Sequence, residues 1–180
     1  MILETDRLIL RGWSDEDAPG LFKYAQDKKV ALSCGWLPHR DEAYSRAVIR
    51  TVLSKEEQYA ICLKGQEDDP IGSIGLSFNE LPGRNRSKKE GELGFWIGVP
   101  FWGQGLAPEA ARELMRHGFE DLDLLGIYCA YFDGNDRSRR VQEKLGFNYH
   151  HTNPELMIPM LGEIRKEYVN LITKQQWFMQ

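Results

Sequence analysis

An apolar stretch runs directly into a glycine-rich turn and then into an amphipathic segment between residues 90 and 122. The stretch EGELGFWIGV has the length and the β-branched and aromatic content of a buried strand, whereas residues 107–122 carry apolar side chains at helical spacing. Between them, VPFWGQGLAPEA contains Gly103 and Gly105, which allow a ligand to approach the backbone closely. In such a unit the free N–H groups of the loop and of the first helical turn point outward together, and the helix dipole adds about half a positive charge. The segment therefore predicts an anion site, in particular for a phosphate.

A second interpretation of this turn is that its glycines only reverse the chain, because isolated G-x-G turns are common. Two widespread phosphate loops are excluded, since the chain has no G-x-x-x-x-G-K-[ST] and the turn lacks the third glycine of G-x-G-x-x-G. Pro108 suits the first helical turn, where its missing N–H would have no partner.

The N-terminal half reads as strands alternating with helices. Residues 7–13 alternate as a strand, and Ser14 with Asp17 resembles a capping box for a helix that ends near Asp27. A second helix is predicted from Asp41, its cap, through Glu57. The residues expected to face inward on it are Ala47, Val48, Thr51 and Val52.

The second predicted helix is followed by a predicted antiparallel hairpin of residues 59–64 and 71–78. After the glycine-rich turn come a strand over 127–132 and a helix over 136–145, which Asn135 can cap and Gly146 can end. Further strands are expected near residues 147–151 and 168–172, and they close a mixed sheet.

Composition favours one soluble domain over residues 1–180, because the chain is 42% apolar and has no Pro/Ser-rich linker or repeat. The net charge of −4 and the pI near 5.6 argue against nucleic-acid binding, and the basic stretch 84–89 reads as a solvated loop. Three cysteines without C-x-x-C predict neither a disulfide framework nor a metal site, and they fit the cytoplasm. No apolar run approaches the ~18 residues of a membrane span, and the N-terminus has no targeting pattern.

The order of strand, W-G-Q-G-L-A turn, helix, strand GIYCAYF and NDRSRRVQEKLGF resembles the GCN5-related N-acetyltransferase (GNAT) superfamily. Its signature Q/R-x-x-G-x-G/A falls on residues 102–107, where Gly105 and Ala107 match and Trp102 departs. An aromatic-Trp-Gly-Lys/Gln-Gly form is common in RimJ/RimL-type ribosomal-protein N-terminal acetyltransferases. The opening ETDRLILRGWSDEDA and the closing residues 167–177 also resemble that branch, so the likeness spans nearly the whole chain.

This resemblance implies an α/β (α+β) GNAT fold, with a mixed, mostly antiparallel sheet, helices on its flanks and a central parallel pair of strands that splay apart. The pantetheine arm of acetyl-CoA would enter that opening. Gly98 and Pro100 give a reason for the splay, because glycine suits a bulge and proline cannot donate to a ladder. The implied cofactor-binding residues are Ile97, Gly98 and Val99 for pantetheine, Trp102, Gly103, Gln104, Gly105, Leu106 and Ala107 for the pyrophosphate, and Asn135, which alternatively only caps its helix.

Acetyl transfer to an amine benefits from a base, because a protonated amine has no lone pair with which to attack. Glu92 is the candidate base or acceptor-binding carboxylate, and Glu90 is its reserve. The N–H of Gly98 or Val99 is the candidate oxyanion donor. Many relatives protonate the leaving thiolate with a Tyr four residues before the Gly of K-L-G-F, but Gln142 stands there in this chain. Ser138, in the N-x-x-S arrangement with Asn135, is therefore the candidate proton donor, unless it only bonds its own helical turn.

The predicted function is transfer of the acetyl group of acetyl-CoA to a primary amine, either a protein N-terminus or a small molecule, by direct attack in a ternary complex. One alternative is an acyl-CoA-binding or regulatory module of the same fold with little catalysis, and another is a phosphate-binding domain that does not use CoA. Trp36 lies in a segment broken by Gly35 and Pro38 and is expected to shape the acceptor site. No metal is predicted, because the adjacent His150 and His151 point to opposite sides of a strand. A homodimer is compatible with this branch.

Overall fold

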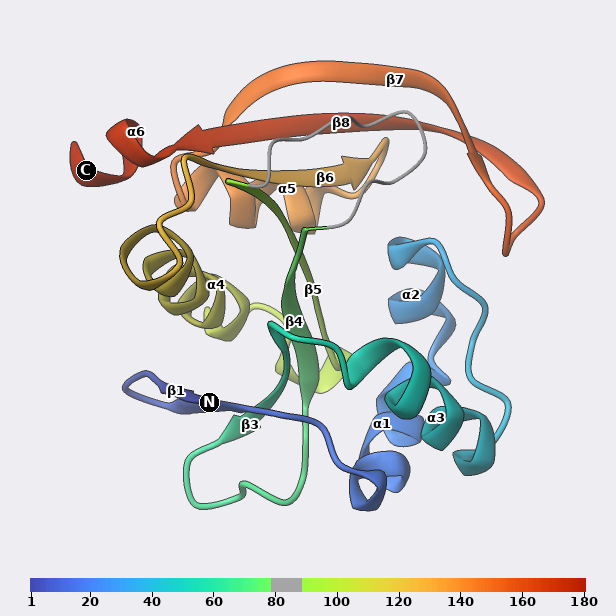
Figure 1. The fold of residues 1–180 in the computed structure, drawn as a ribbon. Helices are drawn as coiled ribbons and strands as arrows, with labels where there is room; N and C mark the ends of the chain where they lie inside the picture. The colour runs from blue at the N-terminus through green and yellow to red at the C-terminus, as the bar shows by residue number, and fades with distance from the viewer. Residues whose placement is uncertain (79–88) are drawn as a thin grey trace. The chain divides into compact units, whose positions relative to one another are not determined.

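The computed structural model describes residues 1–78 and 89–180, and their strands form an eight-stranded sheet in the order β1-β2-β3-β4-β5-β6-β8-β7 (Figure 1). The strands are β1 (Ile2–Glu4), β2 (Leu8–Arg11), β3 (Gln58–Leu63), β4 (Gly72–Ser77), β5 (Glu90–Ile97), β6 (Gly126–Phe132), β7 (Asn148–Ile158) and β8 (Glu163–Thr173). The helices are α1 (Ala18–Ala25), α2 (Lys28–Ala31), α3 (Glu42–Val48), α4 (Leu106–Arg116), α5 (Asp136–Lys144) and α6 (Lys174–Phe178). β5 and β6 run parallel, whereas β1 to β4 and the trio β6, β8 and β7 pair antiparallel. This mixed sheet with a parallel pair inside it confirms the predicted fold class.

Contacts between residues divide the chain into two compact units. The first unit holds residues 1–75 and 95–110, and the second unit holds residues 76–94 and 111–180. β4, β5 and α4 each contribute residues to both units. Residues 79–88, which include most of the predicted basic stretch, lie outside the described residues.

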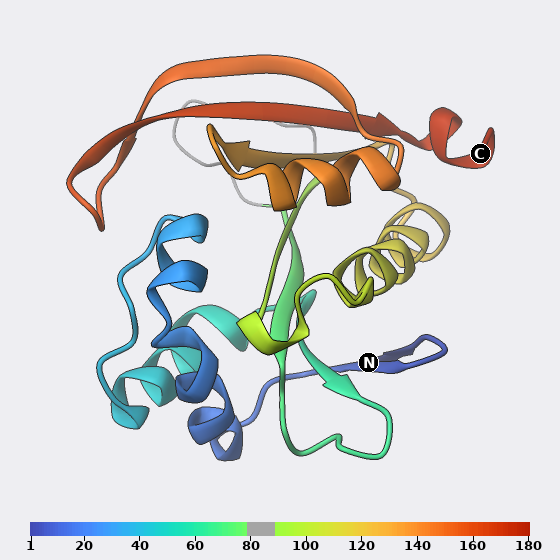
Figure 2. The same ribbon diagram turned by 180° about the vertical axis from the view of Figure 1, so that it is seen from behind.

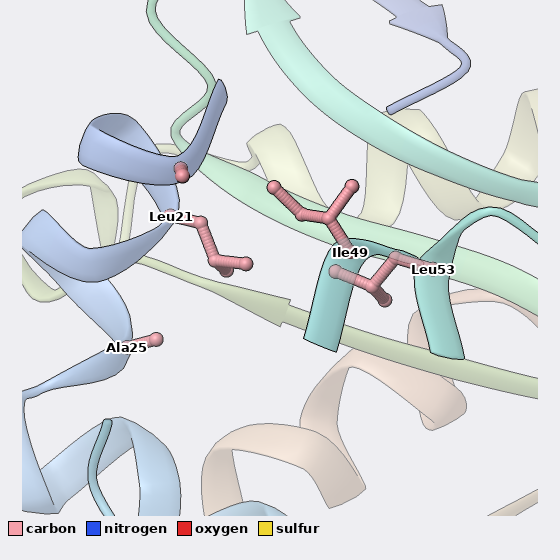
Figure 3. Packing of buried hydrophobic residues seen from close by; sticks show 5 residues of the cluster. Leu21, Ala25, Ile49 and Leu53 are labelled. Carbon is pink, nitrogen blue, oxygen red and sulfur yellow. The ribbon is translucent and has the colours of Figure 1, made fainter. Parts of the chain in front are cut away.

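In the first unit, a small apolar core lies between α1 and the turn that follows α3. Leu21 and Ala25 of α1 meet Ile49 and Leu53 there, as Figure 3 shows. The half-buried indoles of Trp13, Trp36 and Trp96 pack against the same cluster. Burial of each leucine or isoleucine side chain contributes about 1.5–3 kcal/mol relative to leaving it in water, so this cluster holds the helices in place.

The predicted second helix ends earlier than expected, and its buried face is a different one. α3 continues as a π-helical turn, Ile49–Leu53, and Glu57, the expected end, has a φ of 57° that no right-handed helix allows. The buried residues are Ser45, Ile49 and Leu53, four apart, whereas Ala47, Thr51 and Val52 are exposed and Val48 is half-buried. The prediction was wrong because Ser45 is a polar residue on the buried stripe. Its hydroxyl hydrogen-bonds to Nδ1 of His39 at 2.8 Å.

The predicted first helix is interrupted near its end. α1 stops at Ala25, and Asp27 instead caps the short helix α2 by accepting from the N–H of Lys29 at 2.8 Å. At the start, the Asp17 carboxylate accepts from the N–H of Ser14 at 2.8 Å, in agreement with the predicted capping signal. Asp17 also forms a two-point ion pair with Arg11, with N–O distances of 2.6 and 2.8 Å. Burial raises the pKa of Asp17, but these hydrogen bonds together bring it below its usual value.

The second unit is built on β6, β8 and β7, with the parallel strand β5 beside β6. β7 and β8 form a long hairpin that extends well beyond the predicted strands (Figure 1). The register of β7 shifts between Tyr149 and His151 and again between Asn153 and Leu156. The second shift includes Pro154. Proline has no N–H to donate to a ladder, and within sheets it is found at bulges of this kind.

α5 lies along one face of this sheet, as the two opposite views agree (Figures 1 and 2). It starts at the predicted residue and ends at Lys144, one residue before the predicted end. The Asn135 side chain accepts from the N–H of Ser138 at 3.2 Å, and Gly146 follows the helix with a φ of 81°. Capping residues and a C-terminal glycine are local signals, and here they determine the element.

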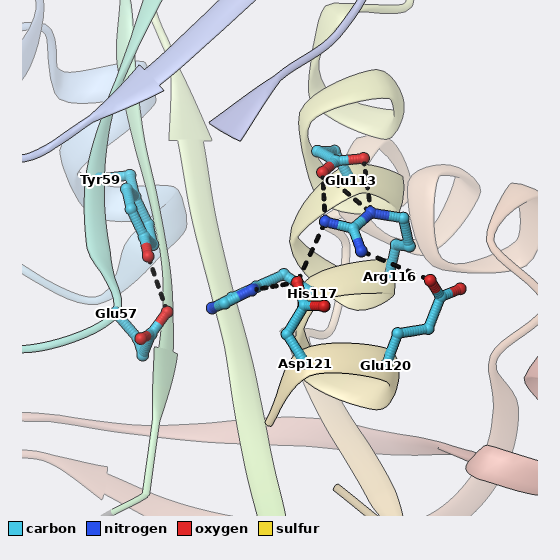
Figure 4. A network of polar contacts seen from close by, with 7 residues as sticks. All are labelled: Glu57, Tyr59, Glu113, Arg116, His117, Glu120 and Asp121. Carbon is cyan, nitrogen blue, oxygen red and sulfur yellow. Dashed lines mark hydrogen bonds and ion pairs between the residues drawn. The ribbon is translucent and has the colours of Figure 1, made fainter. Parts of the chain in front are cut away.

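α4 passes into a second π-helical turn, His117–Asp121, and an ionic network holds that junction (Figure 4). Arg116 pairs with Glu113 at 2.9 Å, with Asp121 at 3.2 Å and with Glu120 at 3.4 Å. The buried His117 hydrogen-bonds to Asp121 through Nδ1 at 2.8 Å. Figure 4 also draws a contact of the first unit, the 2.8 Å hydrogen bond from the Tyr59 hydroxyl to Glu57.

None of the described helices has the length and apolar character needed to span a bilayer. Cys34, Cys62 and Cys129 are free thiols, and burial raises the pKa of each of them.

Candidate functional site

The glycine-rich turn has the backbone that its sequence requires. Gly103 and Gly105 have φ values of 77° and 78°, in the left-handed region that favours glycine. The N–H of Glu109 donates to the Gly105 carbonyl at 3.2 Å, so α4 starts at Leu106, one residue before its expected start. Pro108 lies in this first turn, where its missing N–H leaves no orphaned donor.

The turn presents backbone donors that have no acceptor in the described part of the chain. Among residues 1–78 and 89–180, no backbone or side-chain acceptor takes the N–H of Gly103, Gly105, Leu106 or Ala107. Gly103 and Gly105 are exposed and Ala107 is half-buried. Unused N–H groups at the positive end of an eleven-residue helix form a site with a strong preference for an anion.

Side chains of the turn brace it from within. The Trp102 indole N–H donates to the Ile97 carbonyl at 2.8 Å, and one N–H of the Gln104 amide donates to the Pro100 carbonyl at 2.9 Å. Gln104 is exposed, and its amide keeps a second N–H for a ligand. The turn therefore keeps its shape through its own side chains.

Arg7, which lies just before β2, contacts the glycine-rich turn, and the sequence analysis did not identify this contact. Its guanidinium donates to the Gln104 carbonyl at 3.1 Å and pairs with Glu109 of α4 at 2.6 Å, while the Thr5 hydroxyl donates to the same carboxylate at 2.6 Å. Burial raises the pKa of Glu109, but these hydrogen bonds lower it overall, so the carboxylate stays ionised. Arg7 thus places a cation beside Gly105. No local signal could have indicated a partner about a hundred residues away.

The segment just before the turn contains both N–H groups that the sequence offered as oxyanion donors. Two N–H groups, of Gly98 and Val99, were candidates for stabilising an oxyanion. The N–H of Gly98 donates to the Ile71 carbonyl at 2.8 Å, whereas that of Val99 has no acceptor among the described residues. Gly98 itself is required by packing, because a Cβ there would lie 2.6 Å from the Tyr24 ring. Val99 is the remaining candidate.

In the second unit, the parallel pairing of β5 with β6 is short. The register runs from Glu90 opposite Gly126 to Leu93 opposite Cys129, while β5 continues to Ile97 and β6 to Phe132. The pairing thus ends several residues before Gly98, where the sequence had suggested the break. Glu92, half-buried, lies opposite Tyr128 near the end of the paired stretch.

The side chains of α5 form a connected polar group. Gln142, fully buried, donates from Nε2 to Oγ of Ser138 and to the Ala130 carbonyl, both at 3.2 Å, and its Oε1 accepts from Asn170 at 2.8 Å. Ser138 is half-buried. Its oxygen accepts from Gln142, one turn further along the same helix, so this bond of the Ser138 side chain lies within α5 and fits both the role of a donor and that of a helix-bonding residue.

Trp36 belongs to an aromatic cluster of the first unit. Its ring lies 6.1 Å from Trp96 and 5.3 Å from His39, and His39 lies 5.0 Å from Tyr44. Burial lowers the pKa of His39 to about 4, so the ring is neutral at physiological pH. Trp36 and Trp96 also pack against the apolar core of the first unit.

Other polar residues of the second unit have narrower roles. Glu167 is buried, accepts from Asn153 at 2.8 Å and shares a sheet face with Glu92, because the register places Phe132 beside Glu167 and Tyr128 beside Glu92. A buried carboxylate can hold a cationic group, and a lone glutamate within a strand gave no such signal in the sequence. Among the described residues, no group of three or more His, Cys, Asp or Glu side chains is placed to hold a metal.

The predicted site residues fall in both units. The first unit carries Trp36 and the pantetheine and pyrophosphate residues, namely Ile97, Gly98, Val99, Trp102, Gly103, Gln104, Gly105, Leu106 and Ala107. The second unit carries Glu92, Asn135 and Ser138. A strand that leads through this turn into a helix, followed by a second strand and a capped helix, is the order of elements that the resemblance to the GNAT superfamily implies.

Comparison with known families identifies the class. Residues 7–148 match the family model described as an acetyltransferase (GNAT) domain, and the chain belongs to this family. It is 33% identical over 150 residues to an uncharacterised N-acetyltransferase of Bacillus licheniformis, p20, a match that covers 81% of each protein.

Solved structures show the same fold. A GNAT-family acetyltransferase from Bacillus anthracis superposes with a TM-score of 0.84 at 22% identity, covering 97% of this chain and 99% of that one. A ribosomal-protein-S5-alanine acetyltransferase from Vibrio fischeri superposes with a TM-score of 0.71 at 19% identity, covering 98% of both chains. These likenesses concern the fold, whereas the family rests on the sequence match.

Proposed function

We propose that this protein is an acetyl-CoA-dependent N-acetyltransferase that acts on a primary amine by direct attack in a ternary complex. The observation that carries the proposal is the set of N–H groups of Gly103, Gly105, Leu106 and Ala107 at the start of α4, which no acceptor among residues 1–78 and 89–180 takes. Two left-handed glycines keep these donors open to an approaching phosphate. The family match across residues 7–148 supports the same conclusion and includes residues of both units, which supports a single acetyltransferase domain.

The turn residues would hold the pyrophosphate of CoA without needing a basic side chain to contact it. The second N–H of Gln104 adds a donor, and Arg7 adds a positive charge beside the turn that offsets Glu109 in the first helical turn. The backbone of Ile97, Gly98 and Val99 is proposed to bond the pantetheine arm. Acetyl-CoA supplies an activated acyl group, a thioester carbon open to attack by an amine.

Glu92 is proposed to take a proton from the amine, directly or through a water molecule, as the C–N bond forms. The N–H of Val99 would stabilise the negative charge that develops on the carbonyl oxygen. The C–S bond then breaks, and the Ser138 hydroxyl would donate to the departing sulfur. Glu92 lies on one sheet face of the second unit, and Asn170, which contacts α5, lies on the other. The proposed base and the proposed hydrogen-bond donor to the sulfur are therefore associated with opposite faces.

We further propose that the chain belongs to the RimJ/RimL branch and takes a peptide N-terminus or a small amine of similar size. The W-G-Q-G-L-A turn and the Asn135–Ser138 arrangement support this branch. The aromatic cluster around Trp36 and Trp96 is proposed to contact the acceptor beside its amine.

The test has two stages. In the first, thermal unfolding is followed with acetyl-CoA, with CoA and with pantetheine, which lacks the pyrophosphate. Stabilisation by both CoA forms is expected, and no stabilisation by either would contradict CoA binding. In the second, thiol release is measured with peptides bearing a free N-terminal serine or alanine, with spermidine and with small monoamines. Binding without thiol release from any of them would favour an acyl-CoA-binding module over an enzyme.

A further inference from the structure

Gln142 occupies the position at which many members of the family carry a tyrosine, and it is fully buried. A buried amide is costly unless its polar atoms are paired, and here every one of them is used. Nε2 has two hydrogens, one for the Ala130 carbonyl and one for Ser138 Oγ, and Oε1 accepts from Asn170. The amide is saturated, so it is fixed in place.

The orientation of this amide is determined by its surroundings. The Ala130 carbonyl can only accept a hydrogen bond, so the Gln142 atom facing it at 3.2 Å must be the nitrogen. A flipped amide would place two oxygens against each other there. Asn170, 9% exposed and donating at 2.8 Å, fixes the other side. The second hydrogen of Nε2 is then directed at Ser138, one helical turn earlier.

This arrangement determines the direction of the Ser138 O–H bond. A hydroxyl has one hydrogen, and its oxygen already accepts from Gln142, so the O–H bond points away from the amide. Among residues 1–78 and 89–180 no acceptor takes that hydrogen, and Ser138 is half-buried and reachable. A hydroxyl that accepts one hydrogen bond becomes a stronger donor of another, because chained hydrogen bonds polarise each other.

We propose that Asn170 and Gln142 are positioning residues that aim the Ser138 hydroxyl at the sulfur of the departing CoA. The inference rests on the proposed acetyltransferase function. As the amine nitrogen bonds to the acyl carbon and the C–S bond breaks, the sulfur takes the electron pair, and the Ser138 O–H donates a hydrogen bond to it. A hydroxyl is a weaker acid than a thiol, so Ser138 keeps its proton and the thiolate is protonated from solvent.

A double-mutant cycle separates this role from a purely structural one. Gln142→Met keeps the length of the side chain and removes both of its N–H donors, and Ser138→Ala removes the hydroxyl. Arg140→Met, on the exposed side of α5, is the matched control. Turnover of acetyl-CoA is measured with a peptide bearing a free N-terminal serine and with spermidine. Melting with and without CoA reports folding and cofactor binding for every variant.

We expect Gln142→Met to lower kcat about tenfold and to leave KM for acetyl-CoA nearly unchanged. In the Ser138→Ala background the same substitution should lower kcat less than twofold, since there is no hydroxyl left to aim. Arg140→Met should match the wild type. Equal fold losses in both backgrounds would overturn the proposal, as would a rise in KM that accounts for the whole effect. Wild-type protein that binds no CoA or releases no thiol would instead contradict the proposed function itself.

Asn170→Leu gives a second measurement, because it removes only the outer partner of the amide. It should lower kcat in the same direction as Gln142→Met and lose its effect in the Ser138→Ala background. A crystal structure of the CoA complex should place the sulfur within hydrogen-bond distance of Ser138 Oγ. A sulfur bound out of reach of that oxygen would overturn the proposal independently of any rate.

Discussion

Replacement of Gly103 by alanine tests the phosphate turn with an internal control. Gly103 has a φ of 77°, and an added Cβ would meet nothing within 4 Å. Gly65, also in the first unit, has a φ of 80° and equally open space. Gly65→Ala therefore imposes the same backbone cost at a place with no proposed ligand. Gly105 is a less suitable site, because a Cβ there would lie 3.6 Å from the Arg7 guanidinium.

The two variants should lose similar stability and differ in binding. A left-handed backbone costs an alanine about 1 kcal/mol relative to glycine, so each variant should melt a few degrees lower. In Gly103→Ala the turn relaxes or its N–H groups are shielded, and loss of one hydrogen bond to a charged phosphate costs about 1.5–3 kcal/mol. That loss corresponds to a dissociation constant for CoA about 10- to 100-fold higher.

The assay is calorimetric titration of both variants and the wild type with CoA and with pantetheine. Gly103→Ala should bind CoA more weakly and pantetheine as the wild type does, while Gly65→Ala should match the wild type for both ligands. The reasoning is refuted if both variants lose the same affinity for CoA, or if Gly103→Ala weakens pantetheine as much as CoA.

Three further outcomes follow from the structure. Glu92→Gln should lower kcat by about 100-fold or more with CoA affinity retained, as measured by thiol release and titration, and an unchanged rate would remove Glu92 as the base. The pKa of His39 is about 4 in the folded chain and about 6.5 in the unfolded chain, so the unfolded chain binds the proton more readily and acid favours unfolding. The free energy of unfolding should therefore fall by about 2 kcal/mol from pH 7 to pH 5 in denaturant titrations, and His39→Gln should lack this contribution. Asp17→Asn leaves the Arg11 guanidinium without its ionised partner and should cost about 3 kcal/mol in the same titrations, and a loss under 1 kcal/mol would contradict this estimate.

Local signals in the sequence were sufficient for the elements that they directly control. α5 begins after Asn135 and ends before Gly146 because a cap and a C-terminal glycine act within one helical turn. The glycine-rich turn was predictable for the same reason, since the left-handed backbone of Gly103 and Gly105 is a local property of these two residues. The buried face of α3 was not, because the partner that satisfies Ser45 is a histidine outside the helix.

The contacts that define donors and acceptors at the site are long-range in sequence, and that is why they were missed. The N–H of Gly98 is used by Ile71, which removes one of two candidate oxyanion donors. Arg7 reaches the turn through Glu109, and Gln142 is fixed by Asn170 on a distant strand. Residue type and spacing suggest which groups carry chemistry, whereas the folded chain decides which of their hydrogen bonds are already taken.

The central claim, acetyl transfer from acetyl-CoA to a primary amine, is tested most directly by mass spectrometry of a peptide incubated with the protein and acetyl-CoA. The matched control is the same peptide with a blocked N-terminus, and spermidine serves as a second acceptor. We predict one acetyl group on the free amine of at least one acceptor, CoA thiol released in equal amount, and no product from the blocked peptide. Thiol release without an acetylated amine, or no product from any primary amine, would contradict the account.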